Sequence, residues 1–304
     1  MPKNPKKVFT RKDAEDLMRR RSKRARVILP EDITELEENV FAGCTKLVSI
    51  TIPESVSKIG ASAFEDCINL ESVRMSENIK SIGDSAFASC KMLSEVVIPS
   101  GVTRIEDYTF SGCELLKDVT FPNKLKSIGD YAFIGCTSLT LDSLPNSVKE
   151  IGNHAFEGCT SLVGGTFLPI NIKRLGKSVF VGCSSISSMQ LPCTIREIPD
   201  YTFDGCTSLS EFVFSSSIER IGKFAFNDCI SISEITFPKN IKEVDNYAFK
   251  GCKKLSHIIF EGVSFSIGKN TFKDVYRPEI LVPKASKCFV TEHGGCYYPT
   301  IDRK

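Results

Sequence analysis

The chain has 304 residues, a formal net charge of +2 and a mean hydropathy of −0.05. It is long enough for a sizeable core, and no apolar run reaches the roughly 18 residues that a membrane-spanning helix needs, so no transmembrane segment is expected. The three histidines occupy unrelated repeat positions, and no phosphate-binding glycine loop, metalloprotease motif or nucleophile elbow occurs. We therefore expect no enzyme, no catalytic residue, no metal site and no cofactor.

Residues 1–25 form a basic arm, and residues 1–26 hold eleven lysines or arginines against three acidic residues. Phe9, Thr10 and Asp13 fit a hydrophobic staple, an N-cap and an acidic third helical position, so the arm is predicted to contain a helix that caps a repeat. The alternative interpretation is a nuclear-targeting or polyanion-binding cluster. That cluster consists of Arg19, Arg20, Arg21, Lys23 and Arg24.

A repeat of 23 residues, with one step of 24, runs from a first strand at residues 26–30 to residue 283. Each copy carries a phenylalanine, and in ten copies a cysteine follows three residues later. The phenylalanines are Phe41, Phe64, Phe87, Phe110, Phe133, Phe156, Phe180, Phe203, Phe226, Phe249 and Phe272. A fixed period of this length indicates stacked coils that bury a shared core, here one elongated domain of about eleven coils.

One coil is predicted from the order of apolar, proline and glycine residues within the repeat. Val96 and Ile98 alternate with exposed positions before Pro99, which is typical of a strand that ends at the proline. Val102 and Ile105 then form a second extended piece. The Ala-Phe pair that follows is predicted to open a short helical or 3-10 turn.

The ten repeated cysteines are predicted to form a column of buried thiols about 4.8 Å apart, since coils stacked in register are separated by the interstrand distance. A column of reduced cysteines and the lack of an apolar signal segment in the first 30 residues favour a cytoplasmic protein. The alternatives are the cell surface, reached by a non-classical route, or the nucleus.

Three segments depart from the regular repeat. In residues 139–145, Asp142 is expected at an inward position, and residues 163–169 carry the extra residue, which predicts a bulge. Residues 276–283 are predicted to form a closing strand, and residues 284–304 a tail that caps the last coil. Cys288, His293 and Cys296 in this tail lack a fourth ligand and a Cys-x-x-Cys spacing, so we interpret them as capping residues rather than a zinc site.

The unit Ile-Gly-x-x-Ala-Phe-x-Gly-Cys-x-x-Leu-x-x-Val-x-Ile-Pro, intact or nearly so at 128–145 and 221–238, resembles the BspA-like leucine-rich repeat family over residues 26–283. The resemblance implies an α/β repeat, a right-handed solenoid with a parallel β-sheet on one face and short helical or 3-10 turns on the other. Many members are surface proteins of bacteria and protists implicated in adhesion to host matrix proteins. The sequence predicts no signal peptide and no anchor, so we expect a departure from the surface-exposed members in these two features.

Two candidate interaction surfaces follow from the repeat. The first, the sheet face, is the outward row of the strands and is expected to bind a protein, such as a host matrix protein if the chain is surface-exposed. It consists of Thr51, Arg74, Val97, Thr120, Phe167, Gln190, Val213, Thr236 and Ile259. This predicts a non-enzymatic interaction scaffold or adhesin-like module.

The second surface, the basic stripe, follows the prolines with nearly one cation per coil. It consists of Lys58, Lys80, Arg104, Lys126, Lys149, Lys173, Arg174, Arg196, Arg220 and Lys242. With the basic arm, this stripe gives the alternative function of binding a polyanion, either nucleic acid or a sulfated glycan. The other interpretation is a charged edge that keeps the solenoid soluble and is partly neutralised by neighbouring glutamates.

Overall fold

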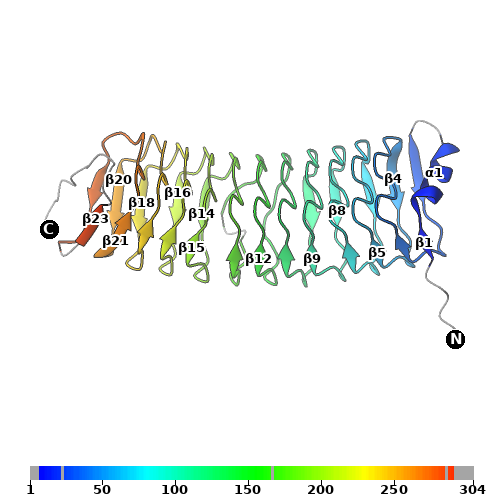
Figure 1. The fold of residues 1–304 in the computed structure, drawn as a ribbon, viewed down its shortest axis with the longest axis horizontal. Helices are drawn as coiled ribbons and strands as arrows, with labels where there is room; N and C mark the ends of the chain where they lie inside the picture. The colour runs from blue at the N-terminus through cyan, green and yellow to red at the C-terminus, as the bar shows by residue number, and fades with distance from the viewer. Residues whose placement is uncertain (1–6, 22–23, 166–167, 285–286, 291–304) are drawn as a thin grey trace.

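The computed structural model describes residues 7–21, 24–165, 168–284 and 287–290. These residues form an elongated parallel β-solenoid of about 12 turns, with its first and last coils at opposite ends (Figure 1). This is one turn more than the number of phenylalanine repeats, because β22 (Glu279–Leu281) and β23 (Lys287–Val290) extend the stack beyond Phe272.

The first side of most coils carries the longer strands. They are β2 (Ala25–Ile28), β4 (Leu47–Thr51), β6 (Ser72–Arg74), β8 (Glu95–Val97), β10 (Asp118–Thr120), β14 (Ser188–Gln190), β16 (Glu211–Val213), β18 (Glu234–Phe237), β20 (His257–Phe260) and β22. These strands pair in parallel with neighbouring coils within four short sheets, β2-β4-β6, β8-β10, β14-β16 and β18-β20-β22. Alternation buries the central residue of the three-residue strands β8, β14 and β16, as at Val96 and Met189, and turns its neighbours outward.

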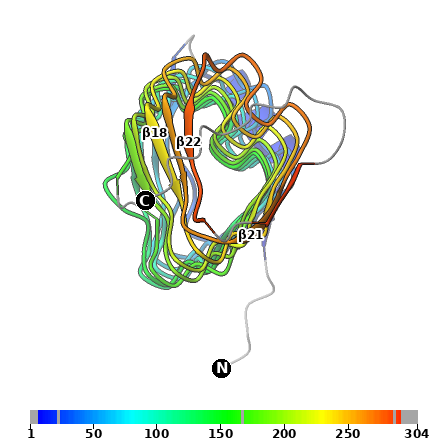
Figure 2. The ribbon, with the colours of Figure 1, turned by 90° about the vertical axis from the view of Figure 1, so that its left-hand side faces the viewer.

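The second side carries shorter strands, mostly of two residues, that form a separate parallel stack. They are β1 (Val8–Phe9), β3 (Glu35–Leu36), β5 (Lys58–Ile59), β7 (Ser81–Ile82), β9 (Arg104–Ile105), β11 (Ser127–Ile128), β12 (Glu150–Ile151), β13 (Arg174–Leu175), β15 (Glu197–Ile198), β17 (Arg220–Ile221), β19 (Glu243–Val244), β21 (Ser264–Ile267) and β23. Seen along the axis, β18 and β22 lie on one side and β21 on another (Figure 2).

The third side consists of tight turns, and the predicted helical or 3-10 turns are wrong. Tyr131 adopts a left-handed backbone conformation with φ 58°, which no helix tolerates. The Phe133 amide donates to the Ala155 carbonyl of the next coil at 2.8 Å, whereas the Ile134 amide donates back to Tyr131 at 3.2 Å. Because alternate amides bond to the next coil, they are not free to make the i to i−4 bonds of a helix.

Glycine is required where this third side meets the second. A side-chain carbon built on Gly152 would lie 2.6 Å from the backbone nitrogen of Asp130 in the preceding coil. The glycine that follows the inward isoleucine in most coils therefore allows the two backbones to approach closely.

The phenylalanines form the central column of the core. Rings in neighbouring coils stack with centroids 5.1 Å apart between Phe64 and Phe87 and 5.4 Å apart between Phe133 and Phe156. Nine of the eleven, from Phe64 to Phe249, are completely buried. The predicted core position of this residue is confirmed.

The irregular segment at residues 139–145 corrects one prediction. Asp142 is exposed, whereas Leu141 and Leu144 are 7% and 4% exposed and occupy the inward positions. Two leucines three residues apart bury more apolar area than the carboxylate would, so Asp142 turns outward. At the insertion, Gly165 pairs with Met189 through a single bridge instead of a strand.

The N-terminal end begins with β1 and the one α-helix of the described residues, α1 (Arg11–Arg19). Thr10 is its N-cap and forms a reciprocal capping box with Asp13, as the sequence predicts. Phe9 stacks on Phe41 with centroids 5.9 Å apart, and the helix buries Ala14 and Met18. The first turn of the solenoid is therefore covered by apolar side chains from residues before the repeat.

Candidate interaction surfaces

The sheet face is a straight row because the long strands pair in register. Arg74 lies beside Thr51, Thr120 beside Val97, Val213 beside Gln190, and Ile259 beside Thr236. Arg74, Val97, Thr120, Gln190 and Val213 are exposed, whereas Thr51, Thr236 and Ile259 are half-buried. Phe167 lies outside the described residues.

One member of this row was not recognised from the sequence. Ile28 is 77% exposed and pairs with Thr51, which places it at the N-terminal end of the same row. The signal was present, because Ile28 stands two residues before Pro30 as Val97 stands two residues before Pro99. The sheet face therefore begins with an exposed apolar side chain.

An open groove of about 490 Å³ crosses the sheet face at β16 and β18. Its walls combine apolar side chains with three carboxylates. The lining residues include Glu211, Phe212, Val213, Phe214, Glu234, Thr236, Pro238 and Glu261. Val213 is 57% exposed, similar to Val97 at 58%. This part of the sheet face is both apolar and acidic.

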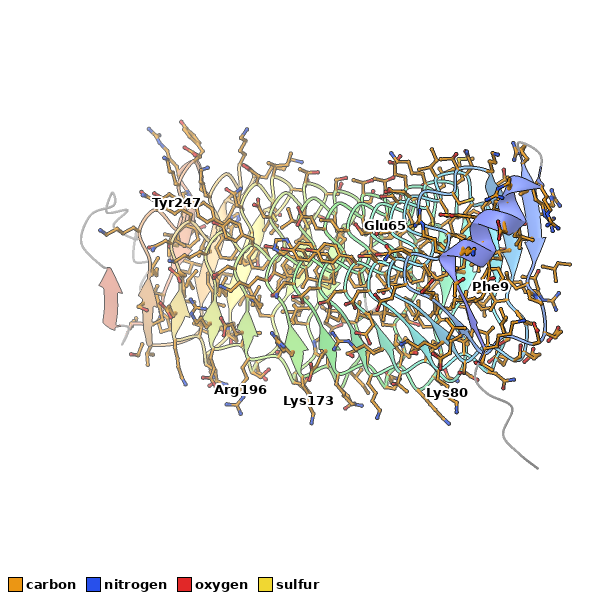
Figure 3. The ribbon with its side chains drawn as sticks, turned by 45° about the vertical axis from the view of Figure 1, so that its right-hand side comes forward. Phe9, Glu65, Lys80, Lys173, Arg196 and Tyr247 are labelled. Atoms are coloured by element: carbon orange, nitrogen blue, oxygen red, sulfur yellow. The ribbon has the colours of Figure 1, made fainter. Side chains whose placement is uncertain are left out.

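The basic stripe divides into sections with different electrostatics. Lys80, Lys173 and Arg196 project from one edge of the solenoid (Figure 3). Towards the C-terminal end the cations are paired: Arg196 contacts Glu219 at 3.2 Å, and Lys242 contacts the same carboxylate at 2.6 Å. The hydrogen bond from Lys242 holds the pKa of Glu219 below its ordinary value.

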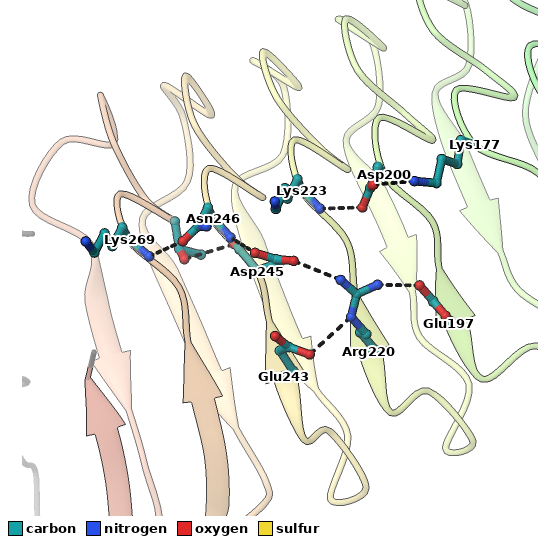
Figure 4. Close-up of polar contacts among 10 residues, drawn as sticks. Lys177, Glu197, Asp200, Arg220, Lys223, Glu243, Asp245, Asn246 and Lys269 are labelled. Atoms are coloured by element: carbon teal, nitrogen blue, oxygen red, sulfur yellow. Dashed lines mark hydrogen bonds and ion pairs between the residues drawn. The ribbon is translucent and has the colours of Figure 1, made fainter. Parts of the chain in front are cut away.

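Arg220 forms the densest ion-pair network on this edge. Its guanidinium contacts Glu197, Glu243 at 3.1 Å and Asp245 at 2.8 Å, which bridges three coils (Figure 4). Asp245 is largely buried, with 9% of the residue exposed. The network neutralises the stripe in these coils, so the C-terminal section offers little unpaired positive charge.

Three of the five clustered cations of the basic arm make contacts within the protein, whereas Arg20 is exposed and has no ion pair with another described residue. Arg19 pairs with Asp16 at 3.2 Å, Arg21 donates to the carbonyl of Arg26 at 2.7 Å, and Arg24 pairs with Glu71. Lys23 lies outside the described residues. Arg24 thereby ties the arm to a coil of the repeat, and two carboxylates offset the charges of Arg19 and Arg24.

The cysteine column consists of protected thiols. Cys113 donates to the carbonyl of Phe87 in the preceding coil at 3.1 Å, and Cys136 repeats this contact with Phe110. Burial raises the pKa of the Cys67 and Cys113 thiols to about 12. Because the thiolate is the nucleophile, these cysteines are inert at neutral pH. The predicted buried column is confirmed for nine of the ten repeated cysteines, and Cys44 at its N-terminal end is half-buried.

The described part of the chain offers few other residues for metal binding or membrane insertion. It contains no cluster of three or more histidine, cysteine or acidic side chains positioned for a metal ion. His293 and Cys296 lie outside it, as does the side chain of Cys288. Within the same residues no helix has the length and hydropathy to cross a bilayer.

The comparisons identify similar proteins. The sequence model of the BspA-type leucine-rich repeat region, with six copies, matches residues 20–140, 103–221, 127–255 and 196–286. A leucine-rich repeat protein from Bacteroides ovatus is 29% identical with a TM-score of 0.79, and the match covers 94% of this chain and 76% of that one. A search of curated proteins found no match.

Two further solved structures are more distant. A leucine-rich repeat protein from Eubacterium ventriosum is 21% identical with a TM-score of 0.51 and 82% coverage of both chains. A leucine-rich cell surface protein from Faecalibacterium prausnitzii is 26% identical with a TM-score of 0.46, and the match covers 78% of this chain and 79% of that one.

Proposed function

Because the chain belongs to the family of BspA-type leucine-rich repeat proteins, we propose that it is a non-enzymatic scaffold that binds a protein partner through its sheet face. Members of this family are often surface-associated, so an adhesin-like role with a host matrix protein as partner is the form of this proposal that we favour. The fold by itself does not specify a partner, so the kind of partner is inferred from the exposed side chains of the sheet face.

The groove at β16 and β18 is the observation that carries the proposal. Exposed β-branched residues also suit solvated strands, so Val97 and Val213 alone would be weak support. At β16, however, exposed Val213 stands beside a concave surface of about 490 Å³ that is lined by Phe212 and Phe214. An apolar anchor in a groove with polar margins is the usual composition of a recognition surface.

The charge of the groove indicates what kind of segment it binds. Glu211, Glu234 and Glu261 line it, and no ion pair joins any of the three to another described residue. A partner segment that carries lysine or arginine beside an apolar residue would complement them. The groove lies where β16 and β18 of two neighbouring sheets come together without pairing, so we propose that it binds an extended segment of the partner that runs across the strands.

The test is binding of the full chain to purified host matrix proteins immobilised on a sensor surface. Val213→Asp should weaken binding about tenfold or more, because it places a charge at the apolar anchor. Val263→Asp is the matched control: Val263 is 49% exposed but lies in the corner between β20 and β21, away from the sheet face.

Two results would contradict parts of this proposal. Equal loss in both variants, or binding unchanged by Val213→Asp, would contradict the sheet face as the binding surface. No binding to any matrix protein, together with an intracellular location of the tagged protein by surface labelling and fractionation, would contradict the adhesin-like form of the proposal.

A further inference from the structure

Three lysines occupy one corner position in three successive coils. Lys126, Lys149 and Lys173 each stand directly before a two-residue strand, β11, β12 and β13. The Lys149 amide donates to the Lys126 carbonyl at 2.7 Å, and the Lys173 amide donates to the Lys149 carbonyl at 2.7 Å. We call this set the lysine ladder; its backbones are spaced by the interstrand distance of about 4.8 Å.

No carboxylate neutralises the lysine ladder. None of its three side chains has an ion pair with another described residue; Lys126 and Lys173 are exposed and Lys149 is half-exposed. Arg174 adds a further cation in the last of these coils. Glu150 is the one acidic residue of these corners; its backbone lies opposite that of Arg174 in the strand pairing, but the two side chains form no ion pair. Like charges on neighbouring strands are destabilising, so the fold gains nothing from this arrangement.

Amide side chains accompany the lysine ladder. Asn123, Asn146 and Asn171 are exposed, one per coil, in the same corners; the first two stand three residues before their lysine, and Asn171 stands two before it. In other coils the corner asparagines support the backbone: Asn78 and Asn240 each donate to a carbonyl of the preceding coil, at 2.8 and 2.7 Å. The amides beside the lysine ladder make no such bond to the described residues, so their donors and acceptors are available to a ligand.

We propose that the lysine ladder and these three asparagines form a binding site for a linear sulfated polysaccharide. Each lysine would pair with a sulfate group, and each amide would exchange hydrogen bonds with sugar hydroxyls. The row is straight, so a flexible linear chain can follow it across successive coils. A single-stranded nucleic acid would also need aromatic side chains for base stacking, and these corners contain none.

This site is separate from the sheet face and does not depend on the proposed function. It also differs from the basic arm, where Arg19 and Arg24 are paired with carboxylates and Arg21 donates to a backbone carbonyl. One set of variants can therefore distinguish the three surfaces.

The experiment measures heparin binding by the full chain in a salt titration. Replacing all three ladder lysines by alanine should weaken binding at least about tenfold and lower the slope of log K against log salt by about 3, one for each lost contact. The matched control replaces Lys117, Lys253 and Lys254 by alanine, which removes the same charge from exposed positions outside these corners. Both variants should melt like the unmodified chain.

Several results would overturn the proposal. Equal weakening in the ladder and control variants would mean that only net charge matters. Loss of binding in an Arg19→Ala, Arg20→Ala, Arg21→Ala variant would assign the site to the basic arm. Undiminished binding of desulfated heparin would exclude sulfate recognition, and tighter binding of single-stranded DNA than of heparin would assign the site to nucleic acid. Val213→Asp should leave heparin binding unchanged.

Discussion

The same corner of the solenoid carries two different charge patterns. In the coils of β11, β12 and β13 the position holds Lys126, Lys149 and Lys173, three like charges that form no ion pair with another described residue. In the coils of β15, β17 and β19 it holds Arg196, Glu219 and Lys242, which alternate in sign and pair at 3.2 and 2.6 Å. The first stretch resembles a surface kept open for a ligand, and the second a surface closed by its own ion pairs.

The backbone does not account for this difference. The Lys149 amide bonds to Lys126 at 2.7 Å, and the Lys242 amide bonds to Glu219 at 2.8 Å, so the corners are built alike. The cores beneath are also alike: Phe133 and Phe156 stack at 5.4 Å, and Phe203 and Phe226 at 5.3 Å. In a repeat protein the inward positions are fixed by packing, while the outward positions are free to differ from coil to coil.

The largest effect is expected from substitutions in the core, which test whether the coils of the two stretches are packed alike. Phe133→Ala beneath the lysine ladder and Phe226→Ala beneath the paired stretch should each reduce the free energy of unfolding by about 3–5 kcal/mol. Both rings are completely buried and stack on phenylalanines on either side. Urea unfolding followed by circular dichroism would measure both values.

Similar values for the two variants would support the view that the stretches differ only at the surface. A cost below about 1 kcal/mol for either would contradict the phenylalanine column as the core, since a removed buried ring leaves a cavity. A large difference between the two would mean that the coils beneath the lysine ladder are packed differently from those beneath the ion pairs.

A smaller effect is expected from the ion-pair network of the paired stretch. Arg220→Ala removes three ion pairs and leaves the largely buried Asp245 without its guanidinium partner. We expect a loss of about 1–3 kcal/mol, because a buried acceptor that loses a charged partner incurs its desolvation cost. Arg174→Ala is the control, since it stands at the same strand position, and it should change the free energy of unfolding by less than about 0.5 kcal/mol. A similar change in both variants would contradict the network's structural role.

The repeat period and the apolar pattern were sufficient to predict the coil, because each inward position needs an apolar side chain in every copy. Phe133 and Cys136 are buried where the sequence places them. The third side was predicted incorrectly, since the Ala-Phe pair is compatible with a helix when only local propensity is considered. Its turns are fixed instead by hydrogen bonds to the next coil, such as that from Phe133 to Ala155, which local propensity does not include.

The surfaces were only partly predictable, because side-chain pairing depends on geometry across coils. The sequence showed nearly one cation per coil but did not show that Arg220 would reach Glu197, Glu243 and Asp245. The groove was missed as well, since it arises where strands from different coils meet. Asp142 was assigned inward because the strand alternation was extended through a segment that forms no strand.

The smallest effect is expected from a substitution that gives one stretch the charge pattern of the other. Lys149→Glu would place a carboxylate between Lys126 and Lys173, as Glu219 lies between Arg196 and Lys242. Two repulsive neighbours become attractive ones, so the free energy of unfolding should rise by about 0.2–1 kcal/mol at low salt. The gain should shrink as salt is added, because screening weakens exposed pairs. Lys117→Glu, at an exposed position outside these corners, is the control.

A stability gain that accompanies loss of heparin binding in Lys149→Glu would show that the lysine ladder is less stable than the alternative available to the same backbone. That combination is expected of a surface whose charges serve a ligand, because unpaired like charges are otherwise unfavourable. If Lys149→Glu and the control Lys117→Glu both leave the free energy of unfolding unchanged at low salt, the lysines of the ladder do not repel one another measurably. The contrast between the two stretches would then carry no energetic cost, and the argument for a ligand at the lysine ladder would depend on the binding data alone.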